Sequence, residues 1–388
     1  MYIAGIDIGK FTHEITIIDN NGSIIKKSFK ITNNHIGANK LMTCLKSLNT
    51  HDIIFGLEAT GHYWLPIYCF LKNKGFTVNV INPIQSDILR NLYIRQTKND
   101  SKDSFIIAEV IRFGRFTSTN LSKENIFSLR QLCRYRKYLV DNISDLKRKT
   151  LCVLDMIFPE YPKLFSDVWG EASKAILSKY PSPEEILSLD IGIIVNELHN
   201  ASRGQLGYAK AEKILDSARH SFGINYSLDV LYFQIKYMME LILETEKQLK
   251  ILENKIEELY LSLDCTLTSI PGIGITLAAI IASEIGYVSR FKDAPSLVAF
   301  AGIDPTVKQS GTYNCNNNKM SKRGSPYLIR ALWSAAKCSY LFDPQLNAYY
   351  NKKCEKGKHH NTAIGPVCHK LTHIIYAIMR DKKIYVSQ

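Results

Sequence analysis

The first 85 residues restrict the fold most, because they hold five strand-forming segments in a recognisable order. The segments YIAGIDIG, HEITIID and SIIKKSFKI follow one another closely. Asn20-Asn21-Gly22, between the second and the third, is a strong hairpin signal, since Asn and Gly tolerate positive φ. A helical segment follows, and then the strand segments DIIFGLEAT and FTVNVINP with a helical segment between them. The sequence therefore predicts three meandering strands, a helix, and then alternating strands and helices.

This order suits an α/β sheet of the RNase H-like type, which has an antiparallel part and a parallel part. In such a sheet the first and fourth strands are neighbours in the middle. From Asp100 onward the apolar residues take a helical period, so we expect a helix to pack on this sheet.

Four acidic residues stand where such a sheet would bring them together. Asp7 lies in the first strand, Glu58 follows the fourth strand, and Asp100 and Asp103 begin the helix after the fifth, three residues apart on one face. Four convergent carboxylates cannot all ionise cheaply without cations. Magnesium prefers oxygen ligands and keeps positions open for phosphate oxygens. The pattern predicts two Mg²⁺ ions, about 4 Å apart, that stabilise the attacking and leaving oxygens of a phosphoryl displacement.

Each acid taken singly also has a structural explanation. Asp100 could be a helix N-cap and Asp103 a first-turn acid favoured by the helix dipole. Glu58, close to Gly61, could end a strand in a loop. Asp7 is harder to explain in this way, because a buried unpaired carboxylate inside an apolar strand is costly. The four acids together favour the metal site.

The composition of the 388-residue chain agrees with a polyanionic partner, because the net charge is +13. No run of about 18 uncharged apolar residues occurs, so no transmembrane helix is expected. The N-terminus has none of the features of a signal peptide. The nine cysteines are scattered without a CxxC pair, which favours reduced thiols in a cytosolic protein. A zinc site formed from Cys354, His359, His360 or Cys368 is the less favoured alternative.

The middle of the chain is helical. Residues 122–158 are rich in Arg and Lys, and residues 159–223 form mixed helical segments interrupted by proline. A long helix then shows a heptad spacing with one polar break at Thr245, which favours a coiled coil within or between chains over an amphipathic helix packed on its own domain. The seam is formed by Leu231, Ile235, Met238, Ile242, Thr245, Leu249, Leu252, Ile256 and Leu259.

Two segments of the C-terminal part could contact phosphate. SIPGIGITLA places Pro271, Gly272 and Gly274 between two helical segments, which is a helix-hairpin-helix pattern whose free N–H groups can dock a DNA backbone. The alternative is a plain turn between helices. The rest of the chain is expected to be mainly helical, apart from a Gly/Asn-rich loop over residues 310–324.

Ser310 and Gly311 begin that loop. A serine there can act as a nucleophile if cations stabilise the phosphate and a base removes its proton, although a Ser-Gly pair in a loop is more often a turn. The cations that could line the phosphate site are Lys319, Lys322, Arg323 and Arg330.

The motifs GIDIGK, LEATGHY, KNDSKDS, IPGIG, FAGIDP with QSG, and SKRG with LIRALW occur in this order. With them the chain resembles the DEDD transposases of bacterial insertion sequences (insertion-sequence 110 / 1111 type). That family includes Piv-type DNA invertases and bridge-RNA-guided recombinases. The resemblance covers about residues 1–155 and 262–345.

The resemblance implies three regions. Residues 1–120 would form a RuvC-like domain whose acids Asp7, Glu58, Asp100 and Asp103 bind Mg²⁺. Residues 121–261 would form a helical linker and coiled coil. Residues 262–388 would form a mainly α C-terminal transposase domain, in which Ser310 attacks DNA and forms a phosphoserine link.

The resemblance also implies the partners: donor and target DNA, a structured non-coding bridge RNA, and further copies of the chain in a homodimer or homotetramer. A bacterial cytoplasmic, nucleoid-associated protein is expected. The chain departs from the family at Ser104, where Ala is common, and in the Asn-rich loop after Ser310. Two other functions stay open, a Holliday-junction nuclease that uses metal-activated water and a non-catalytic nucleic-acid-binding scaffold.

Overall fold

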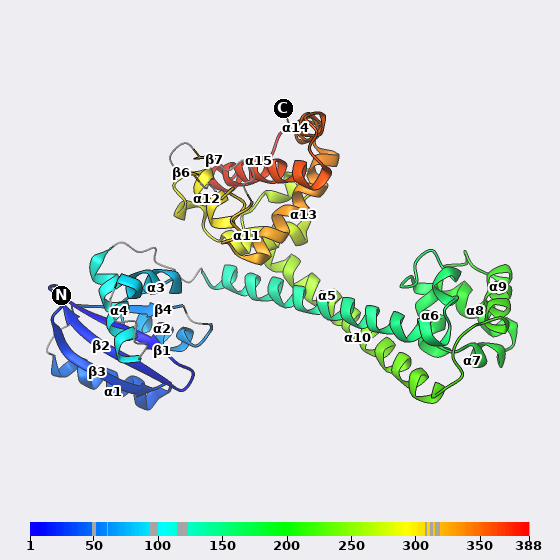
Figure 1. Cartoon of the computed structure of the whole chain (residues 1–388), viewed down its shortest axis with the longest axis horizontal. Coiled ribbons are helices and arrows are strands. Elements are labelled where there is room, and N and C mark those ends of the chain that lie inside the picture. Colours follow the sequence, from blue (N-terminus) through cyan, green and yellow to red (C-terminus); the bar gives the residue numbers. More distant parts are fainter. Residues whose placement is uncertain are drawn as a thin grey trace. The chain divides into compact units, whose positions relative to one another are not determined.

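The computed structural model divides the chain into two units, Met1–Leu121 and Ser122–Gln388 (Figure 1). Within the part of the chain that the structure describes, no helix is long and apolar enough to span a membrane. The described residues are 1–48, 52–59, 61–92, 100–114, 123–306, 309–310, 313–314 and 319–387.

The first unit is built on a mixed five-stranded sheet of order β3-β2-β1-β4-β5. β1 is antiparallel to β2 and parallel to β4, and β4 is parallel to β5. The predicted adjacency of the first and fourth strands is therefore confirmed. The strands are β1 Tyr2–Ile8, β2 Thr12–Asp19, β3 Ile24–Thr32, β4 Ile53–Glu58 and β5 Thr77–Ile81.

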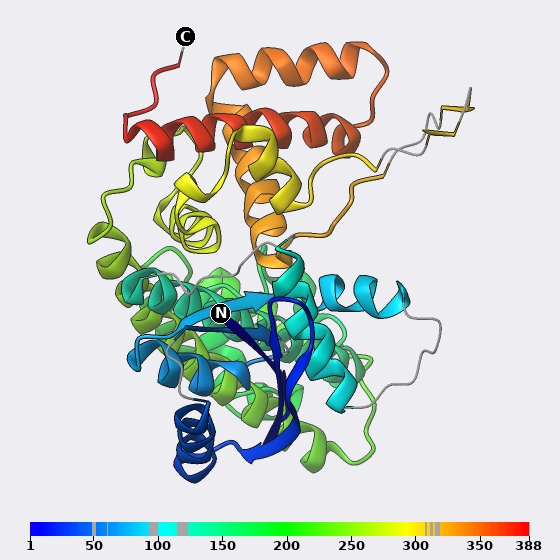
Figure 2. The same ribbon diagram turned by 90° about the vertical axis from the view of Figure 1, so that its left-hand side faces the viewer.

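Helices cover both faces of this sheet. Helices α1 (His35–Ser47) and α2 (Trp64–Asn73) pack on the face that carries Ile6 and Leu57, whereas α4 (Asp100–Phe113) packs on the face that carries Ile3 and Ile18. Figure 2 shows the dark-blue α1 on one side of the blue strands and the cyan α4 on the other. A further helix, α3 (Pro83–Leu92), contacts α4 and was not predicted.

Two long helices form the axis of the second unit. Helices α5 (Glu124–Ile157) and α10 (Leu228–Leu261) pack side by side in opposite directions, as Figure 1 shows. One hydrophobic core gathers around the end of α5 and the beginning of α10. It includes η1 Tyr161–Leu164, α6 Glu171–Lys179, α7 Pro183–Leu187, α8 Ile191–Ala201 and α9 Tyr208–Arg219.

The second core joins the other ends of α5 and α10 to the C-terminal helices. Its elements are η2 Leu267–Ser269, α11 Ile275–Ile285, η3 Val288–Arg290, α12 Ala294–Ala301, α13 Pro326–Phe342, α14 Pro344–Glu355 and α15 His360–Asp381. A short hairpin, β6 Gln309–Ser310 with β7 Tyr313–Asn314, interrupts the helices between α12 and α13.

The predicted heptad seam of α10 is only partly right. Ile235, Ile242, Leu252 and Ile256 are buried as expected, and the seam packs against α5 of the same chain. Met239 and Tyr260 are buried in addition, whereas the predicted Met238 and Leu259 are partly exposed. The seam is therefore wider than predicted, because the predicted residues Leu231, Met238, Leu249 and Leu259 also pack against the two cores while partly exposed.

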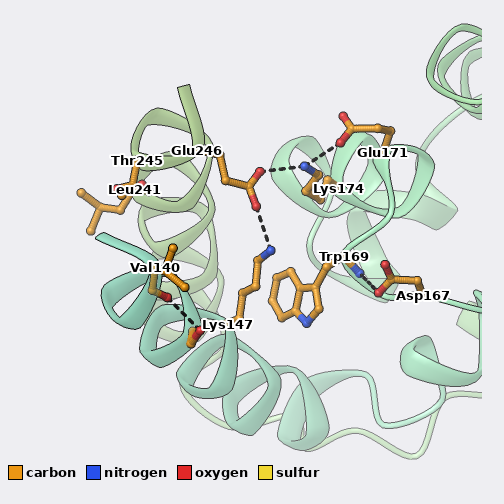
Figure 3. Close-up of polar contacts among 10 residues, drawn as sticks. Val140, Lys147, Asp167, Trp169, Glu171, Lys174, Leu241, Thr245 and Glu246 are labelled. Atoms are coloured by element: carbon orange, nitrogen blue, oxygen red, sulfur yellow. Dashed lines mark hydrogen bonds and ion pairs between the residues drawn. The ribbon is translucent and has the colours of Figure 1, made fainter. Parts of the chain in front are cut away.

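Within the described residues, the polar position predicted at Thr245 forms no hydrogen bond to another helix. The Thr245 hydroxyl donates to the Leu241 carbonyl of its own helix at 2.6 Å. The polar group at the interface is the next residue, Glu246, whose oxygens accept from Lys147 of α5 at 2.7 Å and from Lys174 of α6 at 2.8 Å (Figure 3). Lys174 also pairs with Glu171 at 2.7 Å. Burial alone raises the pKa of the Glu246 carboxyl, but the hydrogen bonds from the two lysines outweigh it and lower that pKa.

Candidate active site

Asp7 and Glu58 lie at one edge of the central sheet. Asp7 is the penultimate residue of β1 and Glu58 is the last residue of the parallel neighbour β4. The register pairs Ile6 with Leu57, so the two acids are the next residues along their strands. Because side chains alternate along a strand and Ile6 and Leu57 face α1 and α2, both acids are on the face that α4 covers.

Two glycines show in which direction α4 crosses this face. A Cβ at Gly5 of β1 would overlap the backbone of Ser104 near the start of α4. At the other end of the helix, a Cβ at Gly22 would meet Glu109 at 3.2 Å. Gly22 lies in the β2–β3 turn, which adjoins the beginning of β1 in the antiparallel pair. Helix α4 therefore runs opposite to β1, and its first turn lies toward the edge that carries the acids.

Asp100 and Asp103 belong to this first turn. Asp103 is buried, with 7% of its surface exposed. Asp100 is the first residue of α4, but its side chain lies outside the part that the structure describes. The start of α4 thus brings the backbone of both residues to the edge where the strands of Asp7 and Glu58 end.

Two buried serine hydroxyl groups form hydrogen bonds next to the acids. The Ser86 hydroxyl of α3 is buried and donates to Oε2 of Glu58 at 2.7 Å, which restricts the orientation of that carboxylate. Ser104, one of the departures from the family pattern, shares a buried hydrogen bond of 2.7 Å with the hydroxyl of Thr16 on β2. The serine at position 104 is therefore satisfied by the sheet beneath it.

Glu14 is a fifth carboxylate on this face, which the sequence analysis missed. It lies opposite Asp7 in the β1–β2 register, and only 10% of its side chain is exposed. Lys30 lies 3.5 Å from its Oε2, and the Ser28 hydroxyl donates to its Oε1. The register that brings them together pairs Ile8 with His13 and Asp7 with Glu14, one residue away from a simple count outward from residues 9–11, so the sequence alone did not show it.

The carboxylates at this edge are of the kind that Mg²⁺ prefers, since each offers hard oxygen ligands. Among the side chains that the structure describes, no three His, Cys, Asp or Glu residues are close enough together to hold a metal ion. Asp100 does not belong to that set. A metal ion here would therefore take ligands beyond the described side chains, from Asp100 or from a bound phosphate.

Ser310 is placed only by its backbone. It ends β6 and pairs with Tyr313 of β7, while its side chain and Gly311 lie outside the described residues. The base of this hairpin is tightly closed, because a Cβ at Gly302 would lie 2.5 Å from the backbone nitrogen of Gly324. The chain therefore packs closely on itself directly after α12, at Gly302 and Gly324.

The four cations predicted around Ser310 come from two parts of the chain. Lys319, Lys322 and Arg323 are exposed on the segment that returns from the hairpin. Arg330 lies in α13 and faces α5, with its guanidinium 3.9 Å from Asp141. It lines a cleft that the other three do not line.

The expected helix-hairpin-helix is a shorter motif in the structure. The segment before the turn is the single 3₁₀ turn η2, whereas α11 follows the turn as predicted. Gly272 has φ of +85°, and a Cβ there would lie 2.7 Å from the Ser339 nitrogen of α13, so this glycine serves packing. Gly274, the N-cap of α11, is exposed and has nothing within 4 Å of its Cβ position. Pro271, which precedes these glycines, is partly exposed.

Comparisons with known proteins agree with the motif-based resemblance. A family model described as "Transposase" matches residues 4–159, and one described as "Transposase IS116/IS110/IS902 family" matches residues 265–351. The chain is 24% identical to the pilin gene-inverting protein of Moraxella lacunata over 98% of both chains. It is 24% identical to an uncharacterized protein of insertion element IS110 from Streptomyces coelicolor, over 82% of this chain and 79% of the relative. An uncharacterized protein of insertion element IS900 from Mycobacterium paratuberculosis is 22% identical over 98% of this chain and 96% of its own.

Proposed function

The chain belongs to the IS116/IS110/IS902 family of transposases, and from this premise we propose that it cuts and rejoins DNA by metal-assisted phosphoryl transfer with a serine nucleophile. The observation that carries the proposal is the meeting of two strand ends and one helix start at a single edge of the sheet, each with an acid. The names of its relatives refer to insertion elements and to pilin gene inversion. The proposed cutting and rejoining of DNA could produce either the movement of an element or the inversion of a DNA segment.

The strand order supports an RNase H-like, RuvC-like assignment for residues 1–120. Its antiparallel strands β1 to β3 and its parallel strands β4 and β5 follow the order expected of such a sheet. We further propose that residues 121–261 act as a coiled-coil spacer and residues 262–388 as the transposase domain. The side-by-side packing of α5 and α10 supports the spacer role.

Asp7, Glu58, Asp100 and Asp103 would hold Mg²⁺, which when bound supplies positive charge for the scissile phosphate and the leaving oxygen. Ser86 keeps the Glu58 carboxylate in one orientation. Burial of Asp103 withdraws that carboxyl from water and so strengthens its interaction with any cation.

Ser310 would carry the covalent step. Its Oγ loses its proton and attacks phosphorus, a P–O bond to the DNA strand breaks, and the strand leaves with a free hydroxyl. In the second step a hydroxyl of the other DNA attacks the phosphoserine, which restores Ser310 and joins the new strand. The bond energy is conserved, so no ATP is required.

We propose a structured RNA from the flanking DNA as a partner, together with donor and target DNA. In that arrangement the protein contacts backbone and shape, and base pairing provides sequence specificity. The net charge of +13 supports a large polyanionic partner. Assembly as a homodimer or homotetramer and residence in the bacterial cytoplasm near the nucleoid belong to the same proposal.

A covalent-trapping assay tests the proposal. The full chain is incubated with the flanking RNA, Mg²⁺ and labelled donor and target DNA, and the products are separated on a denaturing gel. We expect a protein–DNA adduct that disappears in Ser310→Ala and in Asp7→Ala but persists in Ser289→Ala, an exposed serine of η3. Cleaved DNA without an adduct, unchanged by Ser310→Ala, would instead identify a nuclease that uses metal-activated water.

A further inference from the structure

A cleft of about 650 Å³ lies between α5, α11 and α13 in the second unit. Its charged lining residues are Arg134, Arg136, Lys137, Asp141, Glu284 and Arg330. Arg134 pairs with Glu284 and Arg136 pairs with Glu253 of α10 at 2.6 Å, so the surplus positive charge of the cleft comes from Lys137 and Arg330, which share Asp141. We propose that it binds an unpaired nucleotide, with the base stacked on Tyr327 and the phosphate held by Lys137 and Arg330.

The deeper wall of the cleft is a fixed ion pair. Arg134 donates from Nε and Nη2 to the two oxygens of Glu284 at 2.7 and 3.0 Å, and only 4% of the Glu284 side chain is exposed. Such a bidentate pair holds the guanidinium plane in place. The guanidinium lies over the ring of Tyr327 at 4.8 Å, so it presents that ring to the cleft in one orientation. An aromatic ring held in this way can receive a base.

The open side of the cleft has more positive charge than its carboxylate can balance. Asp141, half exposed, is shared between Lys137, four residues before it on α5, and Arg330 of α13 at 3.9 Å. One carboxylate therefore serves two cations, and one positive charge remains. A phosphate that enters here meets both cations near the rim, which suits a ligand with one negative charge per unit.

The first turn of α11 adds donors to the same cleft. Thr276 and Leu277 line it, and their helix begins at Gly274 without a side-chain cap. The first N–H groups of a helix have no partner within the helix and carry partial positive charge.

A nucleotide fits this combination better than a simple anion or an apolar molecule. A positive groove that contains aromatic rings is the arrangement by which proteins hold single strands, since the cations follow the phosphates and the rings stack on the bases. The volume lies within the range of small-molecule sites. The inference rests on the proposed function only in taking nucleic acid as the partner.

Fluorescence anisotropy with the full chain tests the proposal. Labelled, unstructured RNA and DNA oligonucleotides of one sequence are titrated at several salt concentrations. Tyr327→Leu should weaken binding about tenfold through loss of stacking. The double variant Lys137→Gln/Arg330→Gln should reduce the slope of log affinity against log salt by about 0.7 for each lost phosphate contact.

Asp141→Asn gives the sharpest test, because it should tighten binding by about two- to fivefold by releasing both cations from their carboxylate. General damage to the fold would not strengthen binding. Tyr237→Leu and Lys255→Gln are matched controls on the exposed surface of α10, and both should bind like the wild type. Thermal melts followed by circular dichroism establish that each variant is folded.

The outcomes separate the cleft from the proposed function. Cleft variants that bind like the wild type, while the wild type still binds and forms the DNA adduct, overturn the cleft assignment alone. A wild type that binds neither oligonucleotide overturns the nucleic-acid partner and the cleft with it. A greater loss with RNA than with DNA identifies the RNA as the occupant, and the reverse identifies DNA.

Discussion

The carboxylate of Glu246 joins three helices, so its removal should loosen the second unit. It lies on α10 and accepts hydrogen bonds from Lys147 of α5 and Lys174 of α6 (Figure 3). In Glu246→Ala both ammonium groups lose this partner, and the two-helix axis loses its polar link to the α6–α9 core. We expect the free energy of unfolding to fall and local opening of α6 to increase.

The size of the effect follows from how far water reaches the three groups. Breaking a fully buried ion pair destabilises by roughly 3–5 kcal/mol, because the remaining charge is left without a partner. Here 27% of the Glu246 side chain and 23% of Lys147 are exposed, and Lys174, 9% exposed, keeps Glu171 at 2.7 Å. Screening by water and the retained partner should reduce the loss to about 2 kcal/mol.

Hydrogen exchange measured by mass spectrometry localises this loss. A change of about 2 kcal/mol corresponds to an increase of roughly 30-fold in the opening equilibrium, seen as faster exchange in α6 and in the middle of α10. Glu257→Ala, an exposed glutamate of the same helix, is the matched control and should exchange like the wild type. Unchanged exchange in Glu246→Ala would refute the reasoning.

The same contact predicts a pH dependence. Because the folded state lowers the pKa of Glu246, the stabilisation is fully present above the unfolded value, about 4.3 for glutamate, and is lost as the pH falls through the lower folded value. The difference in stability between wild type and Glu246→Gln should be constant near neutral pH and should shrink in acid. A difference that grows in acid would contradict the assigned direction of the shift.

Three further variants test the first unit, each by urea denaturation. Gly5→Ala should destabilise by about 3 kcal/mol or more and abolish the DNA adduct, because the new methyl group overlaps the backbone of α4; wild-type stability would disprove that close packing. Ser104→Ala should lower the free energy of unfolding by about 1–2 kcal/mol, because it leaves the Thr16 hydroxyl unsatisfied, and adding Thr16→Val should restore most of that loss. If the double variant restores nothing, this hydrogen bond is not the cause. Burial lowers the pKa of His13, so the unfolded state binds more protons and wild-type stability should fall as the pH drops below about 6.5. His13→Gln should lose that part of the slope of stability against pH, and an unchanged slope would rule out His13 as its source.

The strand order and the family could be predicted because short-range patterns determine them. The turn at Asn20-Asn21-Gly22, the apolar strand segments and the helical periods are local signals, and each helix or strand they predicted in residues 1–81 is present. Helix α3 was missed. Its start at Asn82-Pro83 is a helix-start signal, but the prediction placed these two residues in the strand segment FTVNVINP.

The seam of α10 shows why the rest could not be predicted. Two alternating patterns, one through Met238 and one through Met239, differ by a single residue and both include Ile235 and Ile242. The choice between them depends on which residues α5 and α6 bring opposite. Lys174, which donates to the Glu246 carboxylate at the interface, lies 72 residues earlier in the chain. Spacing within α10 contains no information about that residue.

At the candidate active site, packing between helix and sheet did leave a local signal in the sequence. Asp7 and Glu58 are each preceded two positions earlier by a glycine, in Gly5-Ile6-Asp7 and Gly56-Leu57-Glu58. Residues two apart share a strand face, so both glycines lie beneath α4, where side chains would collide with the helix. The repeated pattern of glycine, apolar residue and acid thus records a helix packed close against the face that carries the acids. Without these glycines α4 could not pack so close to the sheet, and its first turn would not bring Asp100 and Asp103 to the edge that carries Asp7 and Glu58.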